Sequence, residues 1–280
     1  MKHTDGTFIG ARGLPIYYQY WEPENTPRAL LLIVHGAGEH CNRYETLARH
    51  FTDQGYVVAG LDHPGHGKSG GEYGHIDRFQ DLVDTLETYQ QQVEKDFSGL
   101  PQILLGHSMG GLISALFLLR QQSKFVGCVL SGPAIKTEIE PGYLQLLLIR
   151  CLSVAAPRVG VLQLDAAGVS RDPAVVADYV SDPLVNHKKM TARMVSELFV
   201  AMHHIQNEAN KISLPMLLLH GGKDVMAAPE GSRFLYENIS SEDKSLKIYP
   251  ELFHEIFNEP EREAVFADTL DWCERHIKPS

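Results

Sequence analysis

The sequence has few cysteines and no long apolar run. Its 4 cysteines are scattered through 280 residues without metal-ligand spacing, which predicts free thiols rather than a disulfide framework. No stretch reaches the roughly 18 consecutive apolar residues that a membrane-spanning helix needs. The first residues, Met1–Gly6, lack the apolar segment of a secretory signal. We therefore expect a cytoplasmic protein that does not span a membrane.

Positive charge is also scarce, with 25 lysines and arginines against 35 acidic side chains and a formal net charge of −10. Nucleic-acid binding requires clustered basic side chains that face the phosphates, so this composition argues against a nucleic-acid partner. Nucleotide-binding loops are missing too. Gly65-His66-Gly67 has no third glycine at the dinucleotide-binding spacing, and no phosphate-loop motif occurs.

Histidine, in contrast, is abundant, with 14 residues, and the run Asp62-His63-Pro64-Gly65-His66 brings two of them close together. This run lacks the H-E-x-x-H pattern and comparable metal-ligand spacings, and its glycine favours a turn after a strand. We therefore predict no metal and no other cofactor.

The chain contains a repeated alternation of apolar strands and amphipathic helices. Uninterrupted apolar runs such as 28–34 predict strands that are buried on both faces. The predicted strands are residues 7–13, 16–21, 28–34, 56–61, 102–105, 125–130, 215–219 and 246–249, and the predicted helices are 44–54, 79–97 and 261–277. This alternation indicates an α/β fold, with a mostly parallel central sheet and helices on both faces.

One segment interrupts the alternation, because between Pro133 and Asn210 the pattern is helical and shows no convincing strand. We interpret residues 134–210 as an inserted helical cap, with 1–133 and 211–280 as the two parts of the α/β core.

Two stretches of this cap, 143–149 and 159–164, are more apolar than a surface helix needs. They are consistent with packing on the core, with a tunnel for an acyl chain, or with a lid that faces a membrane surface.

The pentapeptide Gly106-His107-Ser108-Met109-Gly110 fits the G-x-S-x-G pattern of a nucleophile elbow. An apolar strand precedes it and a long apolar helix follows, which is the context that the motif requires. The missing Cβ atoms at positions 106 and 110 allow a tight turn and close packing of helix on strand. The pattern predicts that Ser108 is a catalytic nucleophile.

A serine nucleophile needs a histidine base and an acid that orients the histidine. In this fold the partners follow the serine in the order acid, histidine, each in a loop after a strand. Asp224 follows the strand at 215–219, and His254 follows the strand at 246–249. We therefore predict Ser108, Asp224 and His254 as a catalytic triad.

The negative oxygen formed during ester cleavage needs two N–H donors, one from the residue after the nucleophile and one from an early loop. Met109 is the residue after the nucleophile. The glycine-rich loop 35–39 follows the strand at 28–34, and Ala37 lies in its centre. We predict the backbone N–H groups of Ala37 and Met109 as the oxyanion hole.

With these residues in place, the chain resembles the monoacylglycerol lipases of the α/β-hydrolase superfamily, a group that also contains lysophospholipases. The resemblance lies in His35-Gly36-Ala37-Gly38-Glu39-His40 with Arg43-Tyr44, in Asp62–Ser69, in Leu105–Gly111, in Tyr179-Val180-Ser181-Asp182-Pro183-Leu184, in Leu246–Tyr249 and in His254–Glu259. It implies the α/β-hydrolase fold and the same triad and oxyanion hole.

The resemblance also implies that Glu39, Arg43 and Tyr179 bind the glycerol end of the substrate. A structural ion pair between Glu39 and Arg43 is the alternative for those two residues. Phe257 stands where some members carry a second histidine, so a polar contact from that position is not expected.

The expected protein is a serine ester hydrolase that cleaves monoacylglycerols to fatty acid and glycerol through an acyl-enzyme. A lysophospholipase or a general carboxylesterase is the alternative. A catalytically silent binding protein of the same fold is a third reading, although such a chain should have lost at least one triad residue. The expected partners are a small lipid ester and, through the cap, transiently a membrane surface.

Overall fold

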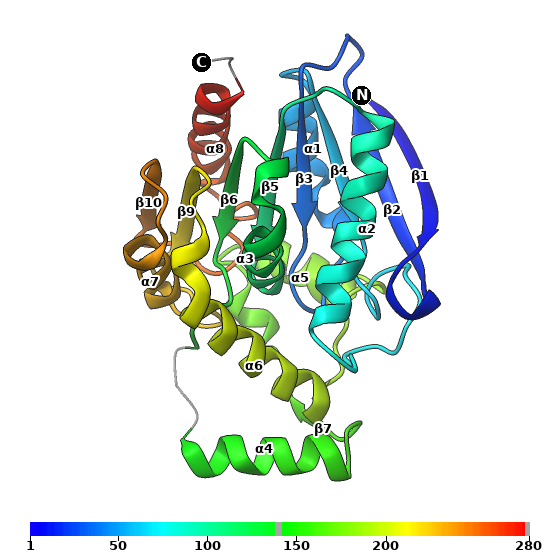
Figure 1. The fold of residues 1–280 in the computed structure, drawn as a ribbon, viewed down its shortest axis with the longest axis vertical. Coiled ribbons are helices and arrows are strands. Elements are labelled where there is room, and N and C mark those ends of the chain that lie inside the picture. The colour runs from blue at the N-terminus through cyan, green and yellow to red at the C-terminus, as the bar shows by residue number, and fades with distance from the viewer. Residues whose placement is uncertain (138–141, 278–280) are drawn as a thin grey trace.

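The computed structural model describes residues 1–137 and 142–277. Within them one eight-stranded sheet has the strand order β1-β2-β4-β3-β5-β6-β9-β10 (Figure 1). The strands are β1 (Lys2–Ile9), β2 (Pro15–Glu22), β3 (Ala29–Val34), β4 (Tyr56–Leu61), β5 (Gln102–His107), β6 (Gly127–Ser131), β9 (Met216–Gly221) and β10 (Lys244–Tyr249). β2 pairs antiparallel with β1 and β4, and the remaining neighbours are parallel. The predicted mostly parallel sheet is confirmed.

Strand β3 is buried on both faces of the sheet, which explains why its sequence is a continuous apolar run. Leu30, Leu32 and Val34 lie in the hydrophobic cluster on one face of the sheet. Alternate residues, among them Leu31 and Ile33, lie in the cluster on the other face. Side chains alternate along a strand, so a strand buried on both faces needs apolar residues at every position.

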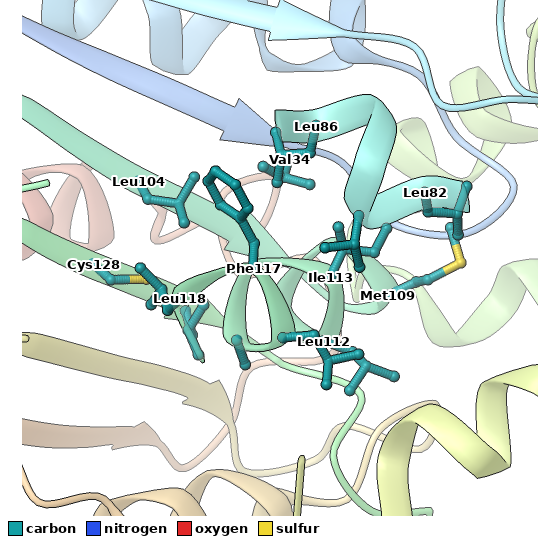
Figure 2. Packing of buried hydrophobic residues seen from close by; sticks show 14 of the residues in the cluster. Val34, Leu82, Leu86, Leu104, Met109, Leu112, Ile113, Phe117, Leu118 and Cys128 are labelled. Atoms are coloured by element: carbon teal, nitrogen blue, oxygen red, sulfur yellow. The ribbon is translucent and has the colours of Figure 1, made fainter. Parts of the chain in front are cut away.

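Helices cover both faces, as the sequence predicts. On one face, α1 (Glu45–Thr52) and α8 (Arg262–His276) bury apolar side chains against the sheet. On the other face lie α2 (Gln80–Asp96), α3 (Met109–Gln121) and α7 (Pro229–Asn238). Figure 2 shows the buried side of α3, where Phe117 and Leu118 lie among Val34, Leu104 and Cys128 of the sheet.

Several elements begin or end at residues other than those predicted from the sequence. The first strand begins at Lys2 rather than at residue 7, and residues 10–14 form a turn in which Arg12 and Gly13 have φ of 56° and 72°. Helix α7 was not identified. β5 and β9 extend two residues beyond the predicted ends, to His107 and Gly221.

Between the core strands β6 and β9 lie α4 (Tyr143–Ala155), α5 (Pro173–Ser181) and α6 (Ala192–Glu208). The expectation of no strand in this segment is wrong, because β7 (Gly160–Leu162) and β8 (Met190–Thr191) pair antiparallel. Strands of three and two residues are too short to show an alternating pattern in sequence. Residues 138–141 of the predicted cap lie outside the described residues.

These elements lie beyond the carboxyl ends of the parallel strands, with α4 farthest from the sheet (Figure 1). The loops after β3 and β4 contact them directly. Asn186 N–H donates to the carbonyl of Gly38 at 2.7 Å, and Thr191 N–H donates to that of Gly74 at 2.9 Å. None of the helices in the two described ranges is both long and apolar enough to cross a membrane.

Candidate active site

Ser108 lies at the turn between β5 and α3, with φ of 54° and ψ of −121°. Among the described residues other than glycine, only Ser108 and Arg12 have positive φ. A Cβ at Gly110 would lie 2.0 Å from the carbonyl oxygen of Val34, and one at Gly106 would lie 2.5 Å from Ser114 Oγ. Both glycines are therefore required by close packing, which keeps the strained turn in place.

The loop after β3 lies against this turn. Ala37 and Met109 both line the pocket that contains Ser108. Met109 is the first residue of α3, where a helix offers no internal acceptor for the N–H group. Gly36 N–H donates to Glu39 Oε1 at 2.6 Å, and Gly38 has φ of 80°. These contacts fix the shape of the loop that carries Ala37.

Asp224 and His254, which come from the loops after β9 and β10, form a hydrogen-bonded pair. His254 Nδ1–H donates to Asp224 Oδ2 at 2.6 Å, and both side chains are buried. The other carboxylate oxygen accepts from the N–H groups of Met226 and Ala227 at 2.8 and 3.0 Å. A Cβ at Gly221 would lie 2.0 Å from the carbonyl oxygen of Phe253, so that glycine lets the two loops approach.

The electrostatic environment lowers the pKa of Asp224 and raises the pKa of His254. Burial alone would raise the pKa of Asp224, but the charge of His254 and hydrogen bonds from His220 and His254 outweigh it and lower the pKa. Burial would lower the pKa of His254, but the carboxylate of Asp224 raises it above its usual value. A carboxylate that accepts from Nδ1 leaves Nε2 of His254 free to take a proton when the ring is neutral.

One pocket brings most of the predicted site residues together. It has a volume of about 90 Å³, and Ser108, His254, Ala37, Met109, Glu39 and Tyr179 all contribute to its lining. Its apolar side comes from the segment between β6 and β9, with Leu162, Leu164, Leu198, Phe199 and Met202. Asp224 and Arg43 do not line the pocket themselves. Asp224 contacts the lining residue His254, and Arg43 contacts the lining residues Glu39 and Tyr179.

Arg43 is held in a buried ion network rather than exposed to the pocket. Its guanidinium donates to both carboxylate oxygens of Glu255 at 2.5 and 2.7 Å and to Glu39 Oε2 at 3.1 Å. The ring of Tyr179 covers it at 4.7 Å. Burial raises the pKa of Glu39, whereas Arg43 outweighs burial at Glu255 and lowers its pKa.

The histidines near Asp62 serve as internal hydrogen-bond partners. His35 Nε2 accepts from His63 N–H at 2.9 Å, and His63 Nε2–H donates to the carbonyl of His35 at 3.1 Å. Burial lowers the pKa of His63 to about 3, which keeps the ring neutral. Among the residues that the structure describes, no group of three His, Cys, Asp or Glu side chains has metal-binding geometry.

Comparisons with known proteins agree with this geometry. A family model described as serine aminopeptidase, S33, matches residues 25–261. The chain belongs to this family. A monoacylglycerol lipase of Mycolicibacterium smegmatis is 38% identical over 274 residues, which cover 98% of each protein. Monoglyceride lipase of Homo sapiens is 34% identical, over 94% of this chain and 88% of that protein.

A solved structure leads to the same family. A soluble variant of monoglyceride lipase from Saccharomyces cerevisiae, in complex with a substrate analog, superposes with a TM-score of 0.84 at 27% identity. The match covers 100% of this chain and 96% of that one. The predicted α/β-hydrolase fold is therefore confirmed, and the chain is a serine hydrolase of the S33 family.

In this hydrolase, three buried residues near His254 contact the site although the sequence did not assign them a role there. Glu255 pairs with Arg43, His107 lies with its ring 4.7 Å from that of His254, and His220 contacts Asp224 at 3.1 Å. All three are immediate neighbours of motif residues or lie at strand ends. The available signal was a histidine at the last position of β5 and at the last but one of β9.

Proposed function

We propose that this hydrolase cleaves monoacylglycerols to a fatty acid and glycerol, with Ser108, Asp224 and His254 as the catalytic triad. The observation that carries the proposal is the 2.6 Å bond between Asp224 and His254 in a pocket that also contains the strained Ser108. The names of the relatives in bacteria, yeast and man support the same substrate class.

The chemistry proceeds in two halves. Ser108 Oγ attacks the ester carbonyl while His254 Nε2 takes its proton and Asp224 stabilises the imidazolium. The N–H groups of Ala37 and Met109 donate to the oxygen that becomes negative. His254 then protonates the departing glycerol oxygen, which leaves an ester of Ser108. Water, deprotonated by His254, attacks this ester and releases the fatty acid.

The polar end of the pocket suits a neutral head group. Glu255 and Glu39 are both paired with Arg43. A substrate ammonium, as in an aminopeptidase substrate, would therefore meet no unpaired carboxylate in this lining. A phosphate would meet no free cation, because Arg43 is already occupied. Hydroxyl groups of glycerol can instead bond to Glu39 and Tyr179, with Arg43 holding both in place.

The acyl chain needs more room than this pocket provides. A second cavity of about 280 Å³ lies between α4 and α6, and it shares Phe199 and Met202 with the pocket at Ser108. Leu146 and Ile149 of α4 add apolar lining. We assign the acyl chain to a path from Ser108 past Phe199 and Met202 into this cavity, with residues 134–210 acting as the cap and 1–133 and 211–280 as the core.

The outer surface of α4 supports a transient contact with a lipid surface. Tyr143, Leu144 and Leu148 are 79%, 77% and 59% exposed, which is far more than large apolar side chains usually show in one place. The same helix lines the second cavity with Leu146 and Ile149. A substrate dissolved in a membrane could therefore enter next to the docked helix, and the expected cytoplasmic protein would act at the membrane periphery.

The proposal is tested by hydrolysis rates on a matched panel. The panel holds monoacylglycerol, lysophosphatidylcholine and diacylglycerol of one chain length, a short p-nitrophenyl ester and an aminoacyl p-nitroanilide. We expect kcat/KM for monoacylglycerol at least about 10²-fold above that for lysophosphatidylcholine, a difference of roughly 2.7 kcal/mol in transition-state binding. A preference for the lysophospholipid or for the anilide would overturn the proposed substrate without removing the triad.

A further inference from the structure

His220 lies at the end of β9 and is fully buried. Its Nε2 is 3.1 Å from Asp224 Oδ2 and 3.0 Å from the carbonyl oxygen of Ala227. Both neighbours are acceptors, so Nε2 must carry a hydrogen. The one hydrogen on Nε2 is therefore shared between the Ala227 carbonyl and the carboxylate that orients His254.

The other ring nitrogen is held as well. Nδ1 of His220 lies 2.7 Å from Ser232 Oγ, on the first turn of α7, and Ser232 is fully buried. In the neutral ring the Ser232 hydroxyl donates to Nδ1, which fixes the tautomer with hydrogen on Nε2. α7 thus acts on Asp224 through His220.

Each oxygen of the Asp224 carboxylate has two donors. Oδ1 accepts from two backbone N–H groups, and Oδ2 is shared between His254 Nδ1 at 2.6 Å and His220 Nε2 at 3.1 Å. Without His220, Oδ2 of Asp224 would be held by the hydrogen bond from His254 alone. The carboxylate could then rotate away from the ring that it must orient.

We propose that His220 is a positioning residue for catalysis, which holds Asp224 by sharing its Oδ2 with His254. The inference rests on the proposed roles of Asp224 and His254. It adds a chain of contacts from α7 to the pocket, in which the hydrogen bonds Ser232–His220 and Asp224–His254 are joined by the 3.1 Å contact between His220 Nε2 and Asp224 Oδ2.

The inference also predicts a pH effect with a definite sign. The N–H of His220 takes up part of the negative charge on Oδ2. Removing that donor leaves more charge facing His254, so protonated His254 becomes more stable and the acid limb of activity moves to higher pH. The other charged or titratable groups that influence His254 are His107 from β5, Glu39 from the loop after β3, and Glu255. They are the same in every variant compared.

The test compares His220→Leu, which cannot donate, with His220→Gln, whose amide nitrogen can occupy the place of Nε2. A short p-nitrophenyl ester serves as the substrate, so the result does not depend on the natural lipid. We expect His220→Leu to lower kcat by about tenfold or more, with KM within about twofold, because a hydrogen bond to a charged group is lost. The acid limb should move upward, and His220→Gln should stay within about threefold of wild type with an unmoved limb.

Ser232→Ala provides a milder change that keeps the ring in place. It should move kcat and the acid limb in the same directions as His220→Leu, but by less. An unchanged kcat and acid limb in His220→Leu, or equal losses in the Leu and Gln variants, would overturn the inference. Asp224→Asn is measured beside them: if it retained wild-type activity, the proposed triad would fail instead.

Discussion

Arg43 donates two hydrogen bonds to the carboxylate of Glu255, the residue next to His254, at 2.5 and 2.7 Å. Its guanidinium also reaches Glu39, which accepts from Gly36 N–H in the loop of the predicted oxyanion hole. One buried cation therefore connects the loop that carries Ala37 to the loop that carries His254. The sequence offered this arrangement only as a Glu39–Arg43 pair.

Arg43→Ala should destabilise the fold strongly, because it removes the cation from the buried carboxylate of Glu255 and leaves the Asn258 amide as its side-chain donor. We expect a loss of about 3–5 kcal/mol in the free energy of unfolding at pH 7, measured by urea denaturation. The pKa of Glu255 is lowered in the native protein, so the pair contributes stability above the unfolded pKa and loses it as pH falls. The deficit should therefore shrink only as the pH falls below the ordinary glutamate pKa of about 4.3.

Arg49→Ala is the matched control, because Arg49 pairs with Glu45 on the exposed surface of α1. That pair should contribute at most about 1 kcal/mol. Equal losses in the two variants would contradict the structural role of Arg43.

Activity should rise with pH as His254 loses its proton. Burial lowers the pKa of His254 but the charge of Asp224 raises it further, so the midpoint should lie above the ordinary value of about 6.5. Asp224→Asn removes that charge, and should lower both the midpoint and, by about 10⁴-fold, kcat. The measurement is kcat/KM against pH on a soluble ester. A midpoint below the ordinary histidine value, or a rate of Asp224→Asn within tenfold of wild type, would argue for another acid.

The core of the fold could be predicted because its strands are buried on both faces. The strands Ala29–Val34 and Tyr56–Leu61 contain no charged residue, so their limits can be placed to within one residue. The candidate triad could be located in the sequence because Ser108 and Asp224 follow apolar strands and His254 follows the next strand, β10. The short strands β7 and β8 could not be predicted, because a pair of two or three residues is defined by a partner some thirty residues away.

The polar contacts around the site could not be predicted from the sequence either. Whether Arg43 faces the substrate or an acid depends on Glu255, which lies 212 residues later in the chain. No local pattern contains such a pairing. His220 was hidden for a different reason, because a histidine that ends an apolar strand looks the same whether it contacts solvent or Asp224.

The proposed acyl path predicts a dependence on chain length that Phe199 controls. Each buried methylene contributes about 0.8 kcal/mol, so four more carbons should raise kcat/KM by up to about 10²-fold. Phe199 lines both cavities, and Phe199→Trp should narrow the passage and flatten this dependence while sparing short esters. Val180→Trp, on the exposed side of α5, should leave the dependence unchanged. If kcat/KM depended equally on acyl-chain length in the wild type and in Phe199→Trp, the acyl chain would have to follow another path.

Docking through α4 predicts different effects on dispersed and soluble substrates. Leu144→Glu and Leu148→Glu should each weaken co-sedimentation with phosphatidylcholine vesicles by about tenfold, because burying a leucine contributes roughly 1.5 kcal/mol or more. Hydrolysis of a soluble ester should be unaffected. Gln145→Glu adds the same charge on the same helix and should change neither. Unaltered vesicle binding in both leucine variants would show that the outer surface of α4 does not bind the lipid surface.

Trapping the acyl-enzyme tests the role of Ser108 as the nucleophile most directly. The protein is acid-quenched during turnover of a p-nitrophenyl ester, digested, and its peptides are weighed by mass spectrometry. We expect an acyl group on the peptide that contains Ser108, none in Ser108→Ala, and a loss of several orders of magnitude in kcat for that variant. Ser123→Ala, at an exposed serine, should behave as wild type. Acylation of a different residue, or near-normal turnover by Ser108→Ala, would show that Ser108 is not the nucleophile.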